Sequence, residues 1–227
     1  MDKVFEQLMK LPLFQGVSSG NLEKMVETIP FHFLKYNVGT TINTVGDPCT
    51  HVRFVFTGTV KVTFVTVSKL TVEYQLPGPD VINPAFLFGI HTVYPFNVIA
   101  TTDCGLLQVK KDDFVQMLQA DQVVLFNYLN FLSRGGQVEV ASMAALAYGS
   151  IAERLGTIVA WLTPQSASNI VIQFKLRDLC RMLSTRRSAL FATLNALQDD
   201  GILTYTPNSI SIIDRKRMLE MRFAENR

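Results

Sequence analysis

The residues best suited to chemistry lie in the segment KLRDLCRMLSTRRSALFATLNALQDDGIL, residues 175–203. Between positions 175 and 187, Asp178 stands alone against five cations: Lys175, Arg177, Arg181, Arg186 and Arg187. From Arg186 onward the leucine spacing predicts an amphipathic helix that ends before Gly201. A helix dipole disfavours each cation at its N-terminus by about 0.3–1 kcal/mol. The two arginines at this end therefore indicate an anionic partner outside the helix.

The distribution of charge along the chain agrees with this interpretation. Residues 1–149 hold 10 Lys/Arg and 12 Asp/Glu, a net charge of −2, whereas residues 150–227 hold 11 and 7, a net charge of +4. Such an asymmetry favours an acidic polymer as partner of the C-terminal part, although a solvated helical face would produce it too.

The cationic helix is expected to belong to a longer C-terminal unit. SIAERLGTIVAWL predicts an amphipathic helix, IVIQF a short strand, KLRDLCRML a second helix, and GILTYTPNSISIID a hairpin that turns at Pro207–Asn208. Two helices joined by a short turn and followed by a hairpin predict a winged helix-turn-helix. The leucines expected to pack its two helices together are Leu179, Leu183, Leu190, Leu194 and Leu197.

On the second of these helices the leucine seam leaves another set of residues facing outward: Arg187, Ser188, Ala192 and Asn195. Ser184 and Thr185 are expected to cap its first turn. The N-terminal residues of such a helix meet base edges in the major groove, where guanine attracts arginine.

The preceding part of the chain reads as a β domain followed by a long helix. Residues 31–109 contain short segments rich in Val, Phe and Thr, broken by glycines, with a turn expected at Gly58; they indicate a sandwich or barrel, with short helices before it. A helical pattern runs from 112 to 148, and between Gln122 and Gly149 it carries Arg134 and Glu139 as its sole charges. This poverty of charge predicts burial on more than one side, against the barrel and against a second copy in a homodimer.

Gly135 and Gly136 fall inside this helical pattern. Each costs about 1 kcal/mol in a helix interior. Either they let two helices approach closely or they break the helix. We place a domain boundary near residue 149, with a sensor barrel and long helix over 1–149 and a DNA-binding domain over 150–227.

In this order of elements the sequence resembles the Crp/Fnr transcription regulators, from about Leu13 to Asp214. The resemblance rests on the glycine-punctuated barrel, the long helix, GSIAERLGTIVAWL and the segment 175–203. It implies an α+β fold with an N-terminal double-stranded β-helix (jelly-roll or cupin-like) barrel, a dimerisation helix and a C-terminal winged helix-turn-helix. Arg187 matches the family's base-reading arginine, while Ser184 replaces the turn glycine, Arg186 a capping serine and Ala192 a second arginine.

The resemblance and the spacing together give the candidate DNA-binding residues: Lys175, Arg177, Thr185, Arg186, Arg187, Ser188 and Asn195. Lys175 and Arg177 are expected to contact phosphates, and Arg187 to read a guanine. The implied partners are double-stranded DNA, a second copy of the chain and RNA polymerase.

Family members that bind cyclic nucleotides use a Gly-Glu and an Arg-Ser pair, which fall here on Asn83–Pro84 and Tyr94–Pro95. A phosphate buried without cations or free amides is costly, and proline offers no N–H. We therefore expect no response to cyclic AMP or cyclic GMP. The positions of this degenerate effector pocket are Asn83, Pro84, Phe86, His91, Tyr94, Pro95 and Glu139. With Phe88 and Phe96, the aromatic side chains either line a pocket for an uncharged ligand or fill it; any effector is unidentified.

Other functions lack their signatures. Cys49, Cys104 and Cys180 are far apart and His32, His51 and His91 are single, so we expect no metal site, iron–sulfur cluster, haem or other cofactor, and no enzyme activity. The absence of an apolar run of membrane-spanning length and of a signal-peptide core predicts a reduced cytoplasmic protein without membrane contact. The alternative function is a ligand-binding or interaction module with no specific DNA target.

Overall fold

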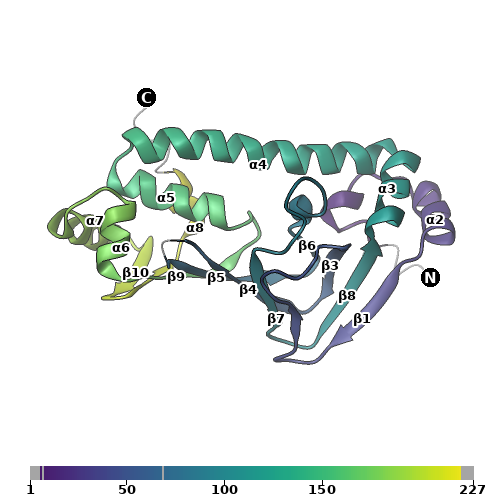
Figure 1. Ribbon diagram of the computed structural model, residues 1–227, viewed down its shortest axis with the longest axis horizontal. Coiled ribbons are helices and arrows are strands. Elements are labelled where there is room, and N and C mark those ends of the chain that lie inside the picture. Colours follow the sequence, from purple (N-terminus) through teal and green to yellow (C-terminus); the bar gives the residue numbers. More distant parts are fainter. Residues whose placement is uncertain (1–5, 7, 68, 221–227) are drawn as a thin grey trace. The chain divides into compact units, whose positions relative to one another are not determined.

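The computed structural model describes residue 6 and residues 8–67 and 69–220. These residues form two compact units: the first comprises the described part of 1–62 with Leu76–Arg134, and the second comprises 63–75 with the described part of 135–227. Figure 1 shows the elements of both. The units divide the chain elsewhere than at residue 149, so the functional division at that residue stays a prediction.

The first unit is a β-barrel-like domain built of antiparallel strands. One sheet has the order β1 (His32–Tyr36), β8 (Cys104–Lys110), β3 (His51–Thr57) and β6 (Asp80–Ile82). A second run of neighbouring strands comprises β4 (Thr59–Val65), β7 (Phe96–Ala100) and β2 (Thr41–Asn43). The glycine-punctuated β region expected from the sequence is therefore present.

The turn between β3 and β4 explains one of these glycines. Gly58 has φ +84°, and a Cβ placed on it would overlap with the carbonyl oxygen of Asp103. Both the left-handed backbone and this close approach require glycine. The turn expected at Gly58 is confirmed.

Helical segments cover the buried face of β3. The 3-10 helix η1 (Pro12–Phe14) and helix α2 (Ser19–Thr28) precede the strands, as expected. The Phe14 side chain is fully buried, and its ring centroid lies 5.5 Å from that of Phe54 on β3. Helix α3 (Lys111–Ala120) follows β8 directly and buries Phe114 and Met117.

The helix expected over about 112–148 is two helices, and this expectation was wrong. Asp121 has an extended backbone (φ −136°) and separates α3 from α4 (Gln122–Tyr148). Its Oδ1 accepts hydrogen bonds from the amides of Val123 (2.8 Å) and Val124 (3.1 Å). Asp121 thus satisfies free N–H groups at the start of α4. Gly135 and Gly136 lie inside α4 and do not end it.

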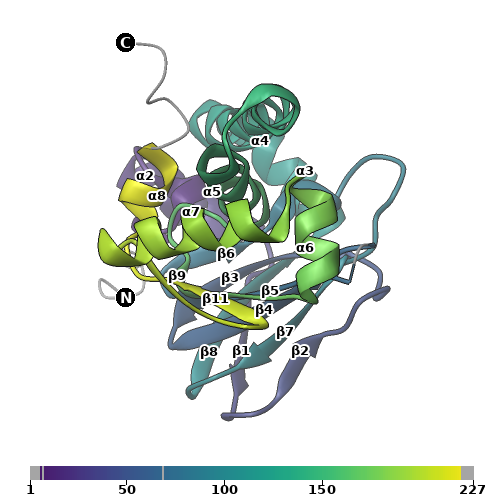
Figure 2. The ribbon, with the colours of Figure 1, turned by 90° about the vertical axis from the view of Figure 1, so that its left-hand side faces the viewer.

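The second unit contains the C-terminal elements in the order that the sequence predicts. They are α5 (Ile151–Leu162), β9 (Ser168–Gln173), α6 (Leu176–Met182), α7 (Arg187–Asp199), β10 (Leu203–Thr206), β11 (Ser209–Ile212) and the unexpected α8 (Arg215–Glu220). Helix α5 begins with a capping box between Ser150 and Glu153. Figure 2 shows α6 and α7 beside the β10–β11 hairpin.

The sheet of the second unit has an unexpected strand. Its order is β10, β11, β9 and β5 (Thr71–Pro77), although the sequence grouped β5 with the barrel. Residues 71–75 of β5 pair antiparallel with β9, with Val72 opposite Ile172, and both side chains are fully buried. The tip of the β4–β5 hairpin therefore contributes to the core of the second unit.

Candidate nucleic-acid interface and barrel interior

A short turn sets the relation of α6 to α7. The amide of Ser184 donates to the carbonyl of Arg181 (3.1 Å) and that of Thr185 to the carbonyl of Cys180 (2.9 Å). Ser184 has φ +48°, the left-handed region in which glycine is usual. The chain thus makes the turn without the family's glycine.

The predicted leucine seam lies in the interior of the second unit. None of its members exposes more than 3% of its surface: Leu179, Leu183, Leu190, Leu194 and Leu197. Burial of each such side chain stabilises the fold by about 1.5–3 kcal/mol. The seam fixes which face of α7 is turned outward.

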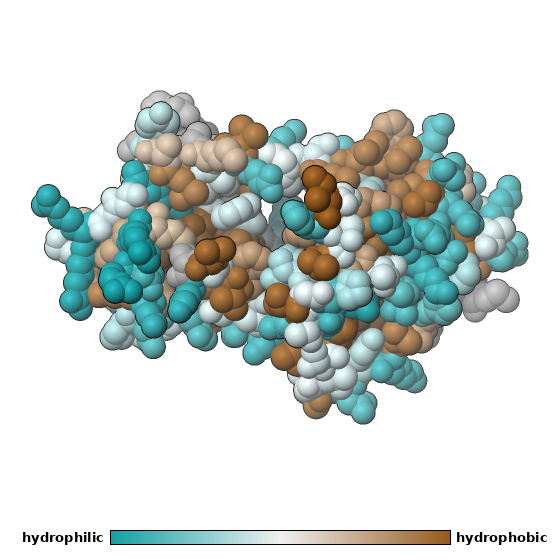
Figure 3. Space-filling view, in the orientation of Figure 1, coloured by the Kyte–Doolittle hydropathy of each residue, from teal (hydrophilic) through white to brown (hydrophobic). Residues whose placement is uncertain are grey.

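The predicted DNA-contact residues are almost all exposed. Lys175, Arg177, Arg186, Arg187, Ser188 and Asn195 are exposed, and Thr185 is half-buried. Ala192 is exposed as well. In Figure 3 hydrophilic side chains gather over the α6 and α7 region.

The start of α7 differs from the expectation. The N-cap is Arg186, Arg187 is the first helical residue, and no side chain caps the helix. Instead of capping the helix, the Thr185 hydroxyl donates to the carbonyl of Arg186 (3.5 Å). The expectation that Ser184 or Thr185 caps the first turn was wrong, because α7 begins later than predicted. The free backbone N–H groups of the first turn of α7 therefore lie at the same end of the helix as Arg186 and Arg187.

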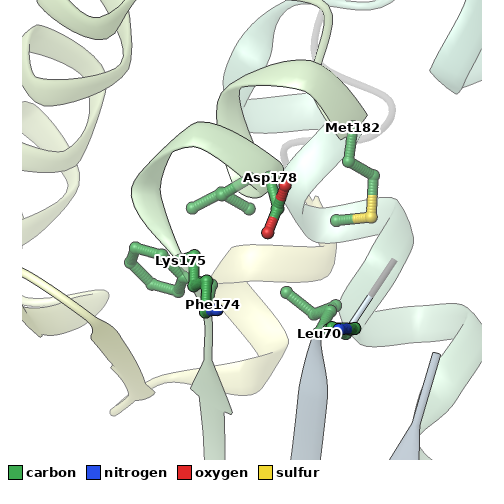
Figure 4. Close-up of a pocket in the computed structure, with 7 residues that line it drawn as sticks. Leu70, Phe174, Lys175, Asp178 and Met182 are labelled. Carbon is green, nitrogen blue, oxygen red and sulfur yellow. The ribbon is translucent and has the colours of Figure 1, made fainter. Parts of the chain in front are cut away.

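The cations of α6 are partly paired. Asp178 is 9% exposed and lies 2.8 Å from Nη2 of Arg181 and 3.6 Å from Nε of Arg177. The Arg177 side chain is still 86% exposed, so its pairing costs little to break. Lys175 lies at the rim of a small hollow of the second unit, shown in Figure 4. The hollow is lined by Lys69, Leu70, Phe174, Lys175, Asp178, Leu179 and Met182.

Two aromatic residues beside the predicted contacts were missed by the sequence reasoning. Phe191 on α7 and Tyr205 on β10 have ring centroids 6.0 Å apart. The signal was available: Phe191 stands four residues after Arg187 and four before Asn195, a spacing that places all three on one helical face.

The predicted effector positions Asn83 and Pro84 are occupied by local structure. Asn83 caps the 3-10 helix η2 (Pro84–Phe86), and its side chain accepts from the amide of Ala85 (3.1 Å). Pro84 is buried, and its carbonyl accepts a hydrogen bond from the Tyr128 hydroxyl (3.3 Å). Burial raises the pKa of Tyr128 to about 12. The Asn83 side chain and the Pro84 carbonyl therefore already have hydrogen-bond partners within the protein.

The aromatic members of the predicted pocket pack on one another. Phe96 lies 6.0 Å from Phe86 and 5.7 Å from Tyr94, measured between ring centroids. Tyr94 and Phe96 are buried, while His91 is exposed and Pro95 half-buried. Glu139, on α4, is exposed. The packing favours aromatic side chains that fill the barrel over ones that line an empty pocket.

A cation that the sequence reasoning overlooked lies in this region. The Arg53 guanidinium, from β3, is 5.6 Å from the centre of the Tyr94 ring and donates to the carbonyl of Ile42 (3.3 Å). Its Nε is buried without a hydrogen-bond partner among the described residues. The sequence argument considered residues 80–103, whereas this arginine comes from a strand 41 positions before Tyr94.

Burial also changes the acidity of groups near Arg53. Desolvation raises the pKa of the Cys49 thiol and that of the Tyr94 phenol, whose hydroxyl donates to the carbonyl of His51 (3.2 Å). Both groups therefore stay protonated at neutral pH.

Two kinds of feature were searched for across the described ranges 6, 8–67 and 69–220. No cluster of His, Cys, Asp and Glu with the arrangement of a metal site was found there. The helices in these ranges include none that is long and apolar enough to cross a bilayer.

With the geometry described, comparison with known proteins identifies the class of the barrel. Residues 33–121 match the family model of the cyclic nucleotide-binding domain. A search of the curated proteins found no match to the chain.

Several solved structures share the fold. The catabolite activator protein of Thermus thermophilus has a TM-score of 0.50 at 18% identity, over 94% of this chain and 99% of that one. The sensor domain of the transcriptional regulator DNR from Pseudomonas aeruginosa has a TM-score of 0.50 at 16% identity, over 59% of this chain and 88% of that one. CprK complexed with OCPA has a TM-score of 0.50 at 11% identity, over 88% of this chain and 92% of that one.

These findings agree, at the level of the fold, with the resemblance that the sequence suggested. The fold is mixed α+β, with a cyclic nucleotide-binding type of β domain over residues 33–121 and helices around it.

Proposed function

We propose that the protein is a dimeric, sequence-specific DNA-binding transcription regulator of the Crp/Fnr type. The observation that carries the proposal is the exposed, arginine-led start of α7, held by a buried leucine seam in a helix–turn–helix–hairpin unit. That arrangement is the one in which a winged helix-turn-helix presents its recognition helix to the major groove. Among the similar folds is one described as an activator protein and one as part of a transcriptional regulator.

The proposed second copy would cover α4. Its first half exposes four large apolar side chains: Val123, Phe126, Leu129 and Leu132. In Figure 3 brown atoms gather over that part of the helix. Val140 and Met143, further along, are more than 70% exposed. Val123, Phe126, Leu129 and Leu132 are spaced by three residues throughout, so the first and the last lie on opposite sides of the helix, while Phe126 and Leu129 between them share one face. An exposed apolar face of this kind is typical of a helix that packs on a second helix. We assign this face to a two-fold homodimer.

The barrel is proposed not to respond to cyclic AMP, since its Gly-Glu and Arg-Ser positions hold Asn83–Pro84 and Tyr94–Pro95. The proposal includes no enzyme activity and a location in the reducing cytoplasm, with RNA polymerase as a further partner on the strength of the family resemblance. An effector, if the barrel takes one, is of a different chemistry.

The test is selection of bound sequences from random double-stranded DNA by the full chain. A two-fold symmetric site with half-sites about 34 Å apart is expected. Recovery of no sequence preference would contradict the proposal.

A salt titration separates the regulator from the alternative, an interaction module without a DNA target. Affinity for an unrelated duplex should fall steeply with salt if phosphate contacts are made, because each contact releases counterions. Absence of binding at low salt would favour the module.

A further inference from the structure

The outward face of α7 carries an ordered stripe of side chains. Arg187, Phe191, Asn195 and Gln198 are spaced by four, four and three residues, so they lie on one face. The Arg187 guanidinium carbon is 5.8 Å from the centre of the Phe191 ring, within the range of a cation–π contact. The arginine therefore lies against an aromatic surface of its own helix.

Tyr205 of β10 holds this stripe from the side. Its ring centroid is 6.0 Å from that of Phe191, with 43° between the ring planes. Its hydroxyl donates to Oδ1 of Asn195 (2.5 Å), and its backbone N–H donates to Oε1 of Gln198 (3.4 Å). Tyr205 is half-buried, whereas Arg187 and Asn195 are exposed.

The strand that carries Tyr205 is itself well fixed. β10 pairs with β11, with Tyr205 opposite the fully buried Ile210. Leu203, two residues earlier, is also fully buried. The hairpin thus provides a stable support for side chains on a neighbouring helix.

We propose that Tyr205 is a positioning residue for DNA recognition: its ring, through Phe191, orients Arg187, and its hydroxyl orients the amide of Asn195. This inference rests on the proposed DNA-binding function. Long side chains lose rotamer freedom when they bind, and a side chain already held in place loses less. Tyr205 therefore acts on affinity and selectivity without contacting DNA.

The orientation of the Asn195 amide defines the base it selects. Bidentate pairing with adenine needs Oδ1 as acceptor for N6 and Nδ2 as donor to N7. Here Oδ1 is turned toward the Tyr205 hydroxyl, which leaves the Nδ2 hydrogens as the outward groups. Arginine is a donor as well. The stripe thus presents donors, and the base whose major-groove edge offers two acceptors and no donor is guanine, through O6 and N7.

The central experiment compares Tyr205→Phe with wild type on the operator selected from random DNA and on an unrelated duplex. The variant keeps the ring and loses the hydroxyl. We expect a five- to tenfold loss of operator affinity, the equivalent of about one hydrogen bond. Non-specific affinity, its salt dependence and the thermal unfolding midpoint should stay unchanged. Thr204→Ala, an exposed neighbour on the same strand, is the matched control and should bind as wild type.

A double-mutant cycle tests the link to Asn195. If Tyr205 acts through the amide, Tyr205→Phe combined with Asn195→Ala should lose no more affinity than Asn195→Ala alone. Additive losses, or wild-type operator affinity for Tyr205→Phe, would overturn the inference. The inference would also be overturned if the wild-type chain preferred adenine at the operator position where Asn195→Ala loses its selectivity.

A separate variant tests whether the Phe191 ring orients Arg187. Phe191→Leu removes the ring beneath the guanidinium and should relax selectivity at the base that Arg187→Ala also relaxes, with unchanged binding to the unrelated duplex. Unchanged selectivity in Phe191→Leu would contradict the positioning of Arg187. Failure of the wild-type chain to bind any duplex at low salt would instead overturn the proposed function.

Discussion

Nη1 of Arg154 donates a hydrogen bond of 2.7 Å to the carbonyl oxygen of Leu183. The contact joins α5 to the end of α6, one residue before the left-handed Ser184. A charged donor on a carbonyl at a helix C-terminus is a strong hydrogen bond and complements the helix dipole. Arg154 therefore helps to hold the turn that sets the direction of α7.

Ser184→Gly should stabilise the protein. A non-glycine residue in the left-handed region is disfavoured by about 1–2 kcal/mol, and glycine loses about 0.5–1 kcal/mol more in chain entropy on folding. The net expectation is a gain of up to about 1 kcal/mol in the free energy of unfolding, measured by urea denaturation.

The same substitution in an ordinary helical position is the control for Ser184. Ser188→Gly, at an exposed site in the first turn of α7, should lower stability by about 0.5 kcal/mol. A loss of stability in Ser184→Gly would show that the serine makes a contribution beyond its backbone conformation.

The parts of the fold with strong local patterns were predictable. The leucine seam of α6 and α7, the hairpin at Pro207–Asn208 and the turn at Gly58 follow from periodicity and turn chemistry, which act within a few residues. The break at Asp121 was missed because the helical pattern of the sequence continues across it. That pattern does not reveal that the Asp121 side chain caps a new helix. The N-cap of α7 was predicted at Ser184 or Thr185 instead of Arg186, because several polar residues precede the helix and each is a possible N-cap.

Long-range features were beyond such reasoning. The pairing of β5 with β9 joins residues about one hundred positions apart, and no local pattern specifies it. The contact of Arg53 with Tyr94 and that of Tyr205 with Asn195 depend in the same way on tertiary packing. The candidate DNA contacts could be found because one short segment contains them.

Phe126→Glu should convert the dimer into monomers. Phe126 is 60% exposed on α4, and a carboxylate there would have to be buried at the proposed helix–helix contact. An uncompensated buried charge costs several kcal/mol, so the dimer dissociation constant should rise at least a hundredfold. Analytical ultracentrifugation measures the change.

Val67→Glu is the matched control for dimerisation. Val67 is fully exposed and, like Phe126, apolar, but it does not lie on α4. It should leave the sedimentation of the dimer unchanged. A dimer in Phe126→Glu as strong as in wild type would place the two-fold contact elsewhere.

Cyclic AMP should neither bind nor stabilise the protein. Ligand at a thousandfold excess over its dissociation constant adds about 4 kcal/mol of stability, which raises the unfolding midpoint by roughly 8–16 °C for a chain of this length. With Asn83–Pro84 and Tyr94–Pro95 at the contact positions, we expect no shift at 1 mM and no heat in calorimetric titration. Micromolar binding would show that other groups, Arg53 among them, hold the phosphate.

Protonation of His51 should lower stability under mildly acidic conditions. Burial lowers the pKa of His51, with further lowering by Arg53, Lys110 and His32 and an opposing effect of Asp113. The unfolded chain therefore binds the proton first, and stability is lost as the pH falls from about 6.5 through the lower pKa of the folded state. Urea midpoints at pH 7.0 and 5.5 should differ less in His51→Gln than in wild type; equal differences would assign the effect to other groups.

Arg187→Ala should weaken binding to the selected operator by about ten- to a hundredfold, corresponding to the roughly 1–3 kcal/mol of a bidentate guanine contact. Its effect should be small on operators in which that guanine is replaced, because the contact is already absent there. Arg186→Ala provides the comparison, since Arg186 is exposed at the N-cap one residue earlier. A phosphate contact weakens binding to all sequences and reduces the salt slope by about one unit. Equal losses of Arg187→Ala on matched and mismatched operators would reassign Arg187 to the phosphates and leave base reading to other residues of α7.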